Sequence, residues 1–374
     1  MFHPQPAFKP EFRLLITFLM GILAFTMLIS LAACNAPGTS DPTQGELPFT
    51  PVASQTMAVD WYDVYFSDPT SPSAKTFRGG PDRALADAIR QARLSVDLAV
   101  YDLDLWSIRD ALLDAFRRGL TVRMVTDSDN LDEPEIQKLI EAGIQVLGDR
   151  SEGLMHNKFV IIDRQDVWTG SMNLTINSAY KNNDNLVHIR APRLARNYTV
   201  EFEEMYLDDQ FGQGSAANTP FPTLRVSGVE LEVYFSPDDH AQEHIVELIQ
   251  GAQKNIYFLA YSLTSDEIAN AMLERTRAGV DVAGVMEAKQ VLSNRGGEYE
   301  KLRAAGLDVR LDANPDNLHH KVIIIDGQTV ITGSYNFSNN AETINDENVL
   351  VIHSPQVANL FMAEFERLFQ AAAP

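Results

Sequence analysis

The sequence repeats itself, and this repeat limits most narrowly what the chain can fold into. The segment VYFS occurs at residues 64–67 and again at 233–236. From His156 onward, one constant offset of 163 positions relates the two halves. The matching residues are His156, Lys158, Asp163, Gly170, Ser171, Asn173, Asn185, Glu201 and Phe202 in the first half and His319, Lys321, Asp326, Gly333, Ser334, Asn336, Asn348, Glu364 and Phe365 in the second. A gap-free match of this length predicts two homologous lobes.

Each half alternates helical segments with apolar extended segments in the same order. The expected helices cover residues 83–92 and 243–252, then segments that stop at Gly119 and Gly279, then segments that end at Gly143 and Gly306. The expected strands cover 95–101, 121–126 and 144–147 in the first half and 255–261, 280–286 and 307–311 in the second. Glycine suits a helix C-terminus. The alternation predicts an α/β fold in which each lobe is a mixed β-sheet flanked by helices.

Composition changes mark the limits of these lobes. Residues 212–224 (GQGSAANTPFPTL) carry the Gly, Ser and Pro of a linker, so we expect a first lobe at 59–211 and a second lobe at 225–374. Residues 34–58 are rich in Pro, Ser, Thr and Gly and are expected to form a tether.

The amino terminus carries an export signal. An uncharged apolar run at residues 14–33 follows Lys9 and Arg13, and it ends in Leu-Ala-Ala before Cys34, the one cysteine of the chain. This junction resembles the lipobox of bacterial lipoproteins, so we expect a signal peptide at 1–33 and lipidation of Cys34. The expected location is the extracytoplasmic face of a membrane. The alternative is an uncleaved signal-anchor helix, since the run is long enough to span a bilayer.

The charge balance limits the classes of ligand. The chain carries 30 Lys and Arg against 51 Asp and Glu, a formal net charge of −21. Such an acidic chain is a poor candidate for holding nucleic acid mainly through phosphate charge, so any site for a polyanion must be locally basic. One cysteine excludes an intrachain disulfide and a Cys-based zinc site.

The residues suited to chemistry lie in two copies of one motif. His156 and Lys158 precede the apolar run 159–162, and His319 and Lys321 precede 322–325. If each motif lies on a buried strand, positions i and i+2 direct His and Lys to one side. A turn then leads to Gly170-Ser171-Met172-Asn173 and Gly333-Ser334-Tyr335-Asn336. We expect both serines to cap helices and to help seat phosphate oxygens at the helix N-termini.

These motifs, H-x-K-x4-D followed by G-S-x-N and present twice, resemble the signature of the phospholipase D superfamily. The resemblance covers most of the chain. It implies a two-lobed αβα sandwich whose motifs meet at a pseudo-twofold axis. It also implies phosphodiester cleavage through a covalent phosphohistidine, without metal or other cofactor. One chain then holds a complete active site, and no protein partner is needed.

The residue types agree with that chemistry. Two-step cleavage needs a nucleophile, an acid for the leaving alcohol and positive charge for the phosphoryl oxygens. Two His, two Lys and two Asn, Asn173 and Asn336, supply these groups. The resemblance implies that His156 is the nucleophile and His319 the general acid.

Four acidic residues and two glycines complete the expected site. In nuclease-like members of the superfamily, an acidic residue 28 positions after the motif His orients that ring, and the resemblance places Asp184 with His156 and Glu347 with His319. Asp163 and Asp326 fall on the opposite strand face from the histidines, so we interpret them as structural. Gly170 and Gly333 are likewise part of the structural motif.

The remaining histidines and some aromatic residues are not assigned to chemistry. His240 and His244 lie at i, i+4 on an expected helix, but no third zinc ligand is evident, so a solvated helix face is expected. His188, His320 and His353 are also left out of the site. The aromatic residues Trp106, Tyr335 and Phe337 either line the mouth of the site or pack in the core.

The expected function is hydrolysis of a phospholipid head-group phosphodiester, because the anchor and the acidic body favour lipid over nucleic acid. The alternative is an exported endonuclease that uses the same chemistry, and a silent binding protein is a further one. The charge around His156 and His319 discriminates between the first two, since a basic track favours nucleic acid and an apolar rim favours lipid.

Overall fold

The structure is a computed structural model that describes residues 60–373. The expected signal peptide and the whole of the expected tether, Cys34 included, lie outside the described residues. Among the described residues, no helix is both long and apolar enough to cross a bilayer.

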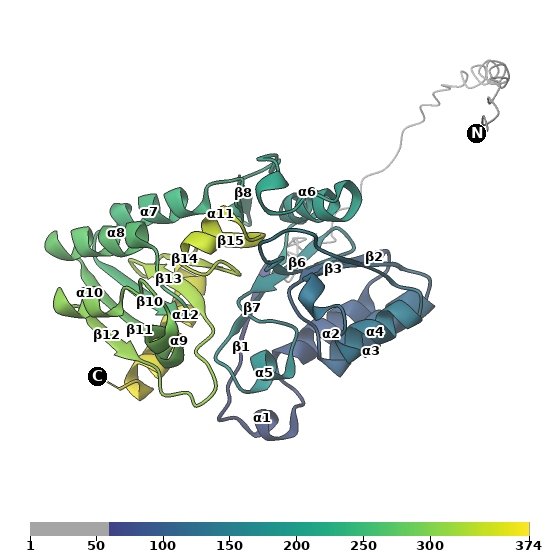
Figure 1. Ribbon diagram of the computed structural model, residues 1–374, viewed down its shortest axis with the longest axis horizontal. Coiled ribbons are helices and arrows are strands. Elements are labelled where there is room, and N and C mark those ends of the chain that lie inside the picture. Colours follow the sequence, from purple (N-terminus) through teal and green to yellow (C-terminus); the bar gives the residue numbers. More distant parts are fainter. Residues whose placement is uncertain (1–59, 374) are drawn as a thin grey trace, which may run out of the picture. The chain divides into compact units, whose positions relative to one another are not determined.

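The first half forms a seven-stranded mixed sheet in the order β1-β7-β6-β5-β2-β3-β4. Figure 1 labels β1, β2, β3, β6 and β7 of this sheet. The strands are β1 (Tyr62–Phe66), β2 (Ser95–Val100), β3 (Thr121–Thr126), β4 (Gln145–Gly148), β5 (Lys158–Ile162), β6 (Asp166–Gly170) and β7 (Asn185–Arg190). β2, β3 and β4 run parallel, and the other neighbours pair antiparallel.

The second half repeats this order in an eight-stranded sheet, β12-β11-β10-β13-β14-β15-β9-β8. Its strands are β8 (Thr223–Val226), β9 (Val229–Ser236), β10 (Asn255–Ala260), β11 (Asp281–Met286), β12 (Asp308–Leu311), β13 (Lys321–Ile325), β14 (Thr329–Gly333) and β15 (Glu347–His353). The added strand β8 begins inside the expected linker, because residues from Thr223 onward pair with β9. The linker therefore ends earlier than the composition indicates.

Helices cover both sheets. They are α1 (Pro72–Thr76), α2 (Pro81–Gln91), α3 (Trp106–Arg117), α4 (Pro134–Glu141), α5 (Ile176–Tyr180), α6 (Pro192–Asp208), α7 (Ala241–Gly251), α8 (Asp266–Arg277), α9 (Ala288–Ser293), α10 (Tyr299–Ala304), α11 (Asn339–Thr343) and α12 (Pro355–Ala371). α3 and α8 are followed by Gly119 and Gly279 with φ of 87° and 91°, a left-handed conformation that glycine adopts without strain.

Strand alternation divides the apolar side chains of the first sheet between its two faces. Val160 and Ile162 of β5 pack with α2, α3 and α4, whereas Phe159 and Ile161 pack with α6. The second sheet is covered in the same way, with α7, α8 and α10 on one face and α12 on the other. The expected α/β fold with two sheet-and-helix lobes is confirmed.

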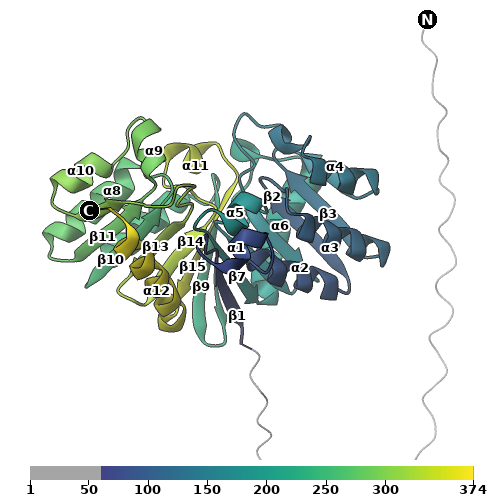
Figure 2. The same ribbon diagram turned by 90° about the horizontal axis from the view of Figure 1, so that it is seen from below.

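The two lobes share one apolar core. α6 packs against β9 of the second lobe and α12 against β1 of the first. Equivalent ring contacts mark both crossings, with centroids 5.1 Å apart for Tyr198 and Phe235 and 5.1 Å apart for Phe361 and Phe66. Figure 2 shows β1, β7, β9, β14 and β15 gathered between the outer helices of the two lobes. The repeat therefore builds one compact unit from the described residues rather than two separate domains.

Candidate active site

The backbone of each motif histidine forms a hydrogen bond with the other lobe, which brings the two motifs together. The His156 N–H donates to the carbonyl oxygen of Asp346 at 3.0 Å, and the His319 N–H donates to that of Asn183 at 2.9 Å. Both histidines lie two residues before β5 and β13, not on these strands as expected. The segment before each strand is free to pair across the lobe boundary because it is not part of its own sheet.

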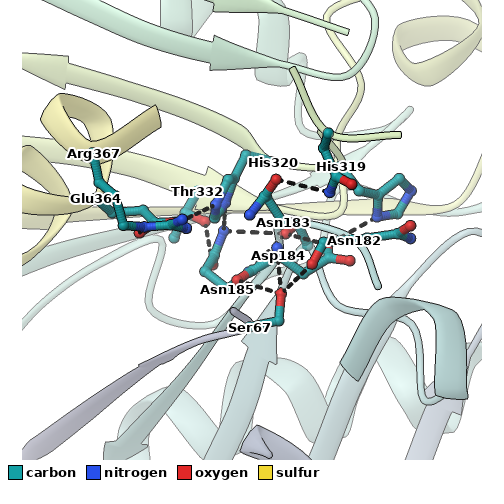
Figure 3. Close-up of polar contacts among 12 residues, drawn as sticks. Ser67, Asn182, Asn183, Asp184, Asn185, His319, His320, Thr332, Glu364 and Arg367 are labelled. Atoms are coloured by element: carbon teal, nitrogen blue, oxygen red, sulfur yellow. Dashed lines mark hydrogen bonds and ion pairs between the residues drawn. The ribbon is translucent and has the colours of Figure 1, made fainter. Parts of the chain in front are cut away.

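The carboxylates that hold the imidazole rings also come from the other lobe. His156 Nδ1 lies 2.8 and 2.9 Å from the two oxygens of Glu347. His319 Nδ1 lies 2.8 Å from Asp184 Oδ1, a pair seen in Figure 3. The expectation that each carboxylate orients the histidine of its own half is therefore wrong. Asp184 and Glu347 lie at or just before the first residues of β7 and β15, where the chain faces the opposite lobe's histidine segment.

This pairing fixes the chemistry of each ring. A carboxylate that accepts a hydrogen bond from Nδ1–H keeps the proton there and leaves the Nε2 lone pair for attack. The same carboxylate stabilises the ring when Nε2 is protonated and donates a proton. His156 and His319 are each 7% exposed, so both rings are largely withdrawn from bulk water.

A buried lysine accompanies each histidine. Lys158 Nζ donates to the carbonyl oxygen of His156 at 2.8 Å, and Lys321 Nζ donates to that of His319 at 2.8 Å. Burial lowers the pKa of Lys158 to about 7 and that of Lys321 to about 8. The two ammonium groups are poorly solvated, so an anion bound between them gains strongly.

Two tyrosines that sequence reasoning missed complete the walls. Tyr101 and Tyr261 meet the rings of His156 and His319 edge-on, with centroids 5.1 and 4.7 Å apart. The Nζ atoms of the two lysines lie 5.4 Å from the Tyr101 ring centroid and 4.8 Å from the Tyr261 ring centroid. Their equivalent positions in the repeat could have indicated them, because each tyrosine directly follows the apolar run of an equivalent strand, β2 or β10.

The two histidines are neutral at pH 7 in the free protein. Burial lowers the pKa of both rings to about 4, against the opposing effect of Glu347 and Asp184. Burial alone would raise the pKa of Asp184, but His319 and Lys321 keep that pKa below its usual value. The two carboxylates are balanced by the two lysines only when both lysines are protonated, and with a pKa of about 7 Lys158 is only partly protonated at pH 7. A bound phosphodiester adds one negative charge, which one imidazolium balances, so binding favours the proton that the acid step needs.

Within the described chain, the motif asparagines each have an unpaired side-chain oxygen. The Oδ1 atoms of Asn173 and Asn336 are buried and lack a hydrogen-bond partner among the described residues. Buried amide groups are seldom left unpaired, so this deficit suits side chains that contact a ligand. Because the unpaired atom is an acceptor, the side-chain amide must be turned so that its NH2 group takes that position before it can donate to a phosphoryl oxygen.

The motif serines have a different role from the one expected. Ser171 and Ser334 do not cap helices, because α5 and α11 begin later and are capped by Thr175 and Ser338. Ser171 Oγ instead donates to Asp184 Oδ1 at 2.7 Å. Ser334 Oγ accepts the backbone N–H of Asn348 at 2.9 Å. The expected phosphate seat at these helix N-termini is therefore absent from the described residues.

The other motif residues hold the backbone. The carboxylate of Asp163 accepts the backbone N–H groups of residues 93–95, and that of Asp326 accepts those of residues 253–255. Gly170 and Gly333 have φ of 144° and 140°, and a Cβ would lie 2.4 Å from Asn185 O and 2.2 Å from Asn348 O. These residues therefore position the site without touching it.

The residues left out of the site lie elsewhere. His320 is buried, and it contacts Asn185 Nδ2 at 3.0 Å and Glu364 Oε1 at 3.2 Å (Figure 3). Tyr335 and Phe337 are core residues, 2% and 1% exposed, and do not line the mouth. Trp106 is 37% exposed and packs under Arg78.

A family model described as "Cardiolipin synthase, PLD-like domain" matches residues 85–206 and 245–369, one segment in each lobe. The chain belongs to this PLD-like family. The matched segments contain every motif residue that the site geometry brings together. The two PLD-like lobes are thus the two halves of the repeat.

Individual relatives agree with this assignment. A phospholipase D of Rickettsia bellii is 30% identical over 163 residues, 42% of this chain and 81% of that protein. A mitochondrial cardiolipin hydrolase of Chlamydomonas reinhardtii is 32% identical over 124 residues, 33% of this chain and 55% of that relative, so the match spans about half its length. A solved phosphatidylserine synthase of Haemophilus influenzae superposes with a TM-score of 0.63 at 16% identity, covering 84% of this chain and 87% of that one. This last likeness shows the PLD-like fold alone.

The charge beside the PLD-like motif is acidic rather than basic. Burial and the nearby carboxylates of Asp127 and Asp102 raise the pKa of Tyr101. Burial and Glu287 raise the pKa of Tyr261. These two rings lie next to the histidines. Burial raises the pKa of Asp102 to about 6. These carboxylates give the surroundings of the two lysines a negative sign.

Proposed function

We propose that this protein is a metal-independent phosphodiesterase that cleaves the head-group phosphodiester of a phospholipid. The observation that carries the proposal is the pair of imidazoles, each fixed through Nδ1 by a carboxylate of the other lobe, with a buried lysine beside each. Such a pair supplies one nucleophile and one acid without a metal ion.

The reaction proceeds in two balanced steps. His156 Nε2 attacks phosphorus, the bond to the leaving alcohol breaks, and protonated His319 gives its Nε2 proton to that oxygen. His319, now neutral, takes a proton from water, whose oxygen attacks the phosphohistidine and releases His156 and a phosphomonoester. Lys158, Lys321 and the motif asparagines stabilise the phosphoryl oxygens throughout.

A groove beside the site supports a lipid substrate. It has a volume of about 450 Å³ and reaches Asn183, whose carbonyl binds the His319 N–H. Its walls are formed by side chains of the α1 segment, the end of α5, the loop after β12 and helix α12, among them Phe77, Tyr180, Pro315, Leu368 and Ala371. The charged residues of the lining are Lys75, Lys181 and Arg367 together with Asp312 and Asp316, and Arg367 is paired with Glu364. This mixture of apolar and charged groups suits an amphiphile.

The acidic surroundings of the motif support lipid over nucleic acid. A polyanion that tracks past Asp102, Asp127 and Glu287 meets like charge, and the chain as a whole carries −21. A single phospholipid presents only its own head group to the two lysines and avoids that repulsion.

Membrane attachment through Cys34 is part of the proposal. The support is the LAAC junction behind an apolar run. We expect mass spectrometry of the membrane fraction to find an acylated Cys34 at the mature amino terminus. A mature product that still contains the bond between Ala33 and Cys34 would contradict this.

The deciding experiment compares substrates in EDTA. A soluble form that begins near Ala58 is given phosphatidylcholine or cardiolipin vesicles, or single- or double-stranded DNA, at several salt concentrations. We expect release of head group or phosphatidate with little effect of salt, and none from the His156→Ala/His319→Ala variant. DNA cleavage that falls steeply with salt would support the endonuclease instead. Equal results for wild type and variant on every substrate would leave a silent binding protein.

A further inference from the structure

One row of polar side chains crosses four strands of the second sheet, at the end remote from the motifs. Arg225 of β8 pairs in register with Glu230 of β9, Glu230 pairs with His353 of β15, and His353 pairs with Thr329 of β14. Glu232 follows two residues after Glu230, so its side chain lies on the same sheet face. Strand register therefore gathers two carboxylates and one imidazole.

These three side chains have the spacing of a cation site. One donor atom from each of Glu230, Glu232 and His353 lies within 4.8 Å of the other two, and all three residues are partly buried. Ligands at 2.0–2.2 Å from a tetrahedral Zn²⁺ lie about 3.3–3.6 Å apart. Movements of the donor atoms by roughly 1 Å therefore bring the three side chains to zinc-binding distance. Among the described residues, this is the one group of three His, Cys, Asp or Glu donors with such spacing.

Each of the three donors is held by a neighbour. Arg225 donates to Glu230 Oε2 at 2.9 Å, and the hydroxyl of Tyr234 donates to Glu232 Oε2. Thr329 Oγ1 lies 3.0 Å from His353 Nδ1. The Nε2 atom of His353 therefore faces the carboxylates, 2.6 Å from Glu232 Oε1. Metal-binding histidines are commonly oriented in this way through their second nitrogen.

At the equivalent position of the first lobe, an arginine rather than a metal ion neutralises the carboxylate. By the repeat, Arg190 is equivalent to His353 and Asp63 to Glu232. Arg190 donates to Asp63 Oδ2 at 2.6 Å. The second lobe thus has an imidazole, which can bind a metal ion, where the first has a guanidinium, which cannot.

We propose that Glu230, Glu232 and His353 bind one zinc-type divalent cation. An imidazole nitrogen with two carboxylate oxygens suits Zn²⁺ and leaves a fourth position for water. A cavity of about 410 Å³, lined by Glu232, Tyr234 and His244 among others, gives the ion access from solvent.

This cation lies far from the reaction centre. His353 ends β15, whereas Glu347 begins it, and six residues of strand span about 20 Å. The ion joins β9 to β15, two neighbouring strands next to the edge strand β8, and it takes no part in phosphodiester cleavage. Its binding is independent of the function proposed above.

The test is zinc binding by the full chain, followed by calorimetry, metal analysis and thermal melting. We expect one Zn²⁺ per chain and a melting temperature about 5 °C higher at a hundredfold excess over Kd. Glu232→Gln and His353→Arg abolish both effects. His353→Arg copies the first lobe, so it should melt like the metal-free wild type, which shows that its fold is intact.

Two further variants separate this site from other donors. Glu247→Gln changes a carboxylate that lines the same cavity, and it should leave zinc binding unchanged. Zinc that persists in His353→Arg but is lost from His156→Ala/His319→Ala would place the ion at the motif histidines and overturn the proposal. Absence of zinc binding by the wild type at 0.1 mM Zn²⁺, a concentration on the order of weak protein sites, would also overturn it.

Discussion

At the scale of single residues, each motif histidine takes its orientation from a carboxylate far away in the sequence. His319 and Asp184 are 135 positions apart, and His156 and Glu347 are 191 apart. A substitution in one lobe therefore changes the protonation chemistry of a histidine in the other. The two carboxylates differ in their further partners. Ser171 Oγ donates to Asp184, whereas Asn345 Nδ2 donates to Glu347 at 3.3 Å.

The crossed pairing predicts which variants resemble each other. Asp184→Asn should impair His319, the proposed acid, and Glu347→Gln should impair His156, the proposed nucleophile. We expect each variant to lower kcat/KM by roughly 10²- to 10⁴-fold, as when a catalytic histidine loses the carboxylate that orients it. A nitrophenolate leaving group, which needs no proton, should partly rescue Asp184→Asn and His319→Ala.

The same substrate should not rescue Glu347→Gln or His156→Ala. Rates are compared between a nitrophenyl and an alkyl diester, with wild type as reference. If Asp184→Asn behaves like His156→Ala, either the crossed pairing or the assignment of nucleophile and acid is wrong. Rescue of His156→Ala rather than His319→Ala singles out the second cause.

Ligand binding should take up a proton. Both rings have a pKa of about 4 and are neutral at pH 7, and a bound phosphodiester anion raises the pKa of one of them. Binding of a non-hydrolysable phosphonate should therefore weaken about tenfold per unit rise in pH near neutrality. Calorimetry in buffers of different ionisation enthalpy counts the protons, and uptake of none would contradict the charge balance described for the site.

At the scale of elements, the turn after each motif strand is held by a side chain, and the next strand ends in a glycine that permits close packing. Asp163 and Asp326 accept consecutive backbone N–H groups and tie the β5–β6 and β13–β14 turns to the start of β2 and β10. Gly170 and Gly333 then let β6 and β14 end against β7 and β15, immediately before the motif serines.

Replacement of Gly333 by alanine should destabilise the protein strongly. The new Cβ would meet Asn348 O at 2.2 Å, and the backbone already has φ of 140°. We expect a loss of about 3 kcal/mol or more in the free energy of unfolding. Gly251→Ala is the matched control, because its Cβ has open space near the end of α7, and it should change stability by under ~1 kcal/mol. Denaturant unfolding measures both, and equal stability of the two variants would contradict the packing argument.

At the scale of the whole molecule, the two lobes depend on each other for both core and site. The inner sheet faces with α6 and α12 form one apolar cluster, and neither lobe alone holds a histidine together with its carboxylate. The duplication therefore produced one folding unit with one site, and the segment that joins the lobes is the part least needed to hold them together.

Cleavage of the joining segment should leave an active protein. Residues 215–220 are largely exposed, so a protease site inserted there can be cut without opening the core. We expect the two pieces to co-elute in gel filtration at the mass of the intact chain and to keep most of the activity. Separation of the pieces under native conditions would show that the shared core is too weak to hold them.

Much of this protein was determined by sequence alone. The fixed offset of the repeat, the H-x-K-x4-D and G-S-x-N motifs and the glycine-stopped helices determine local conformation, and these led to the α/β fold, the two lobes and the residue types of the site. The tertiary structure alone decided how those residues pair. It placed Asp184 with His319 and Glu347 with His156, brought Tyr101 and Tyr261 beside the rings, and turned Ser171 from a helix cap into a support for Asp184. The physical reason is that motif spacing reports contacts along one strand or turn, whereas contacts between lobes depend on how two sheets pack through a shared core.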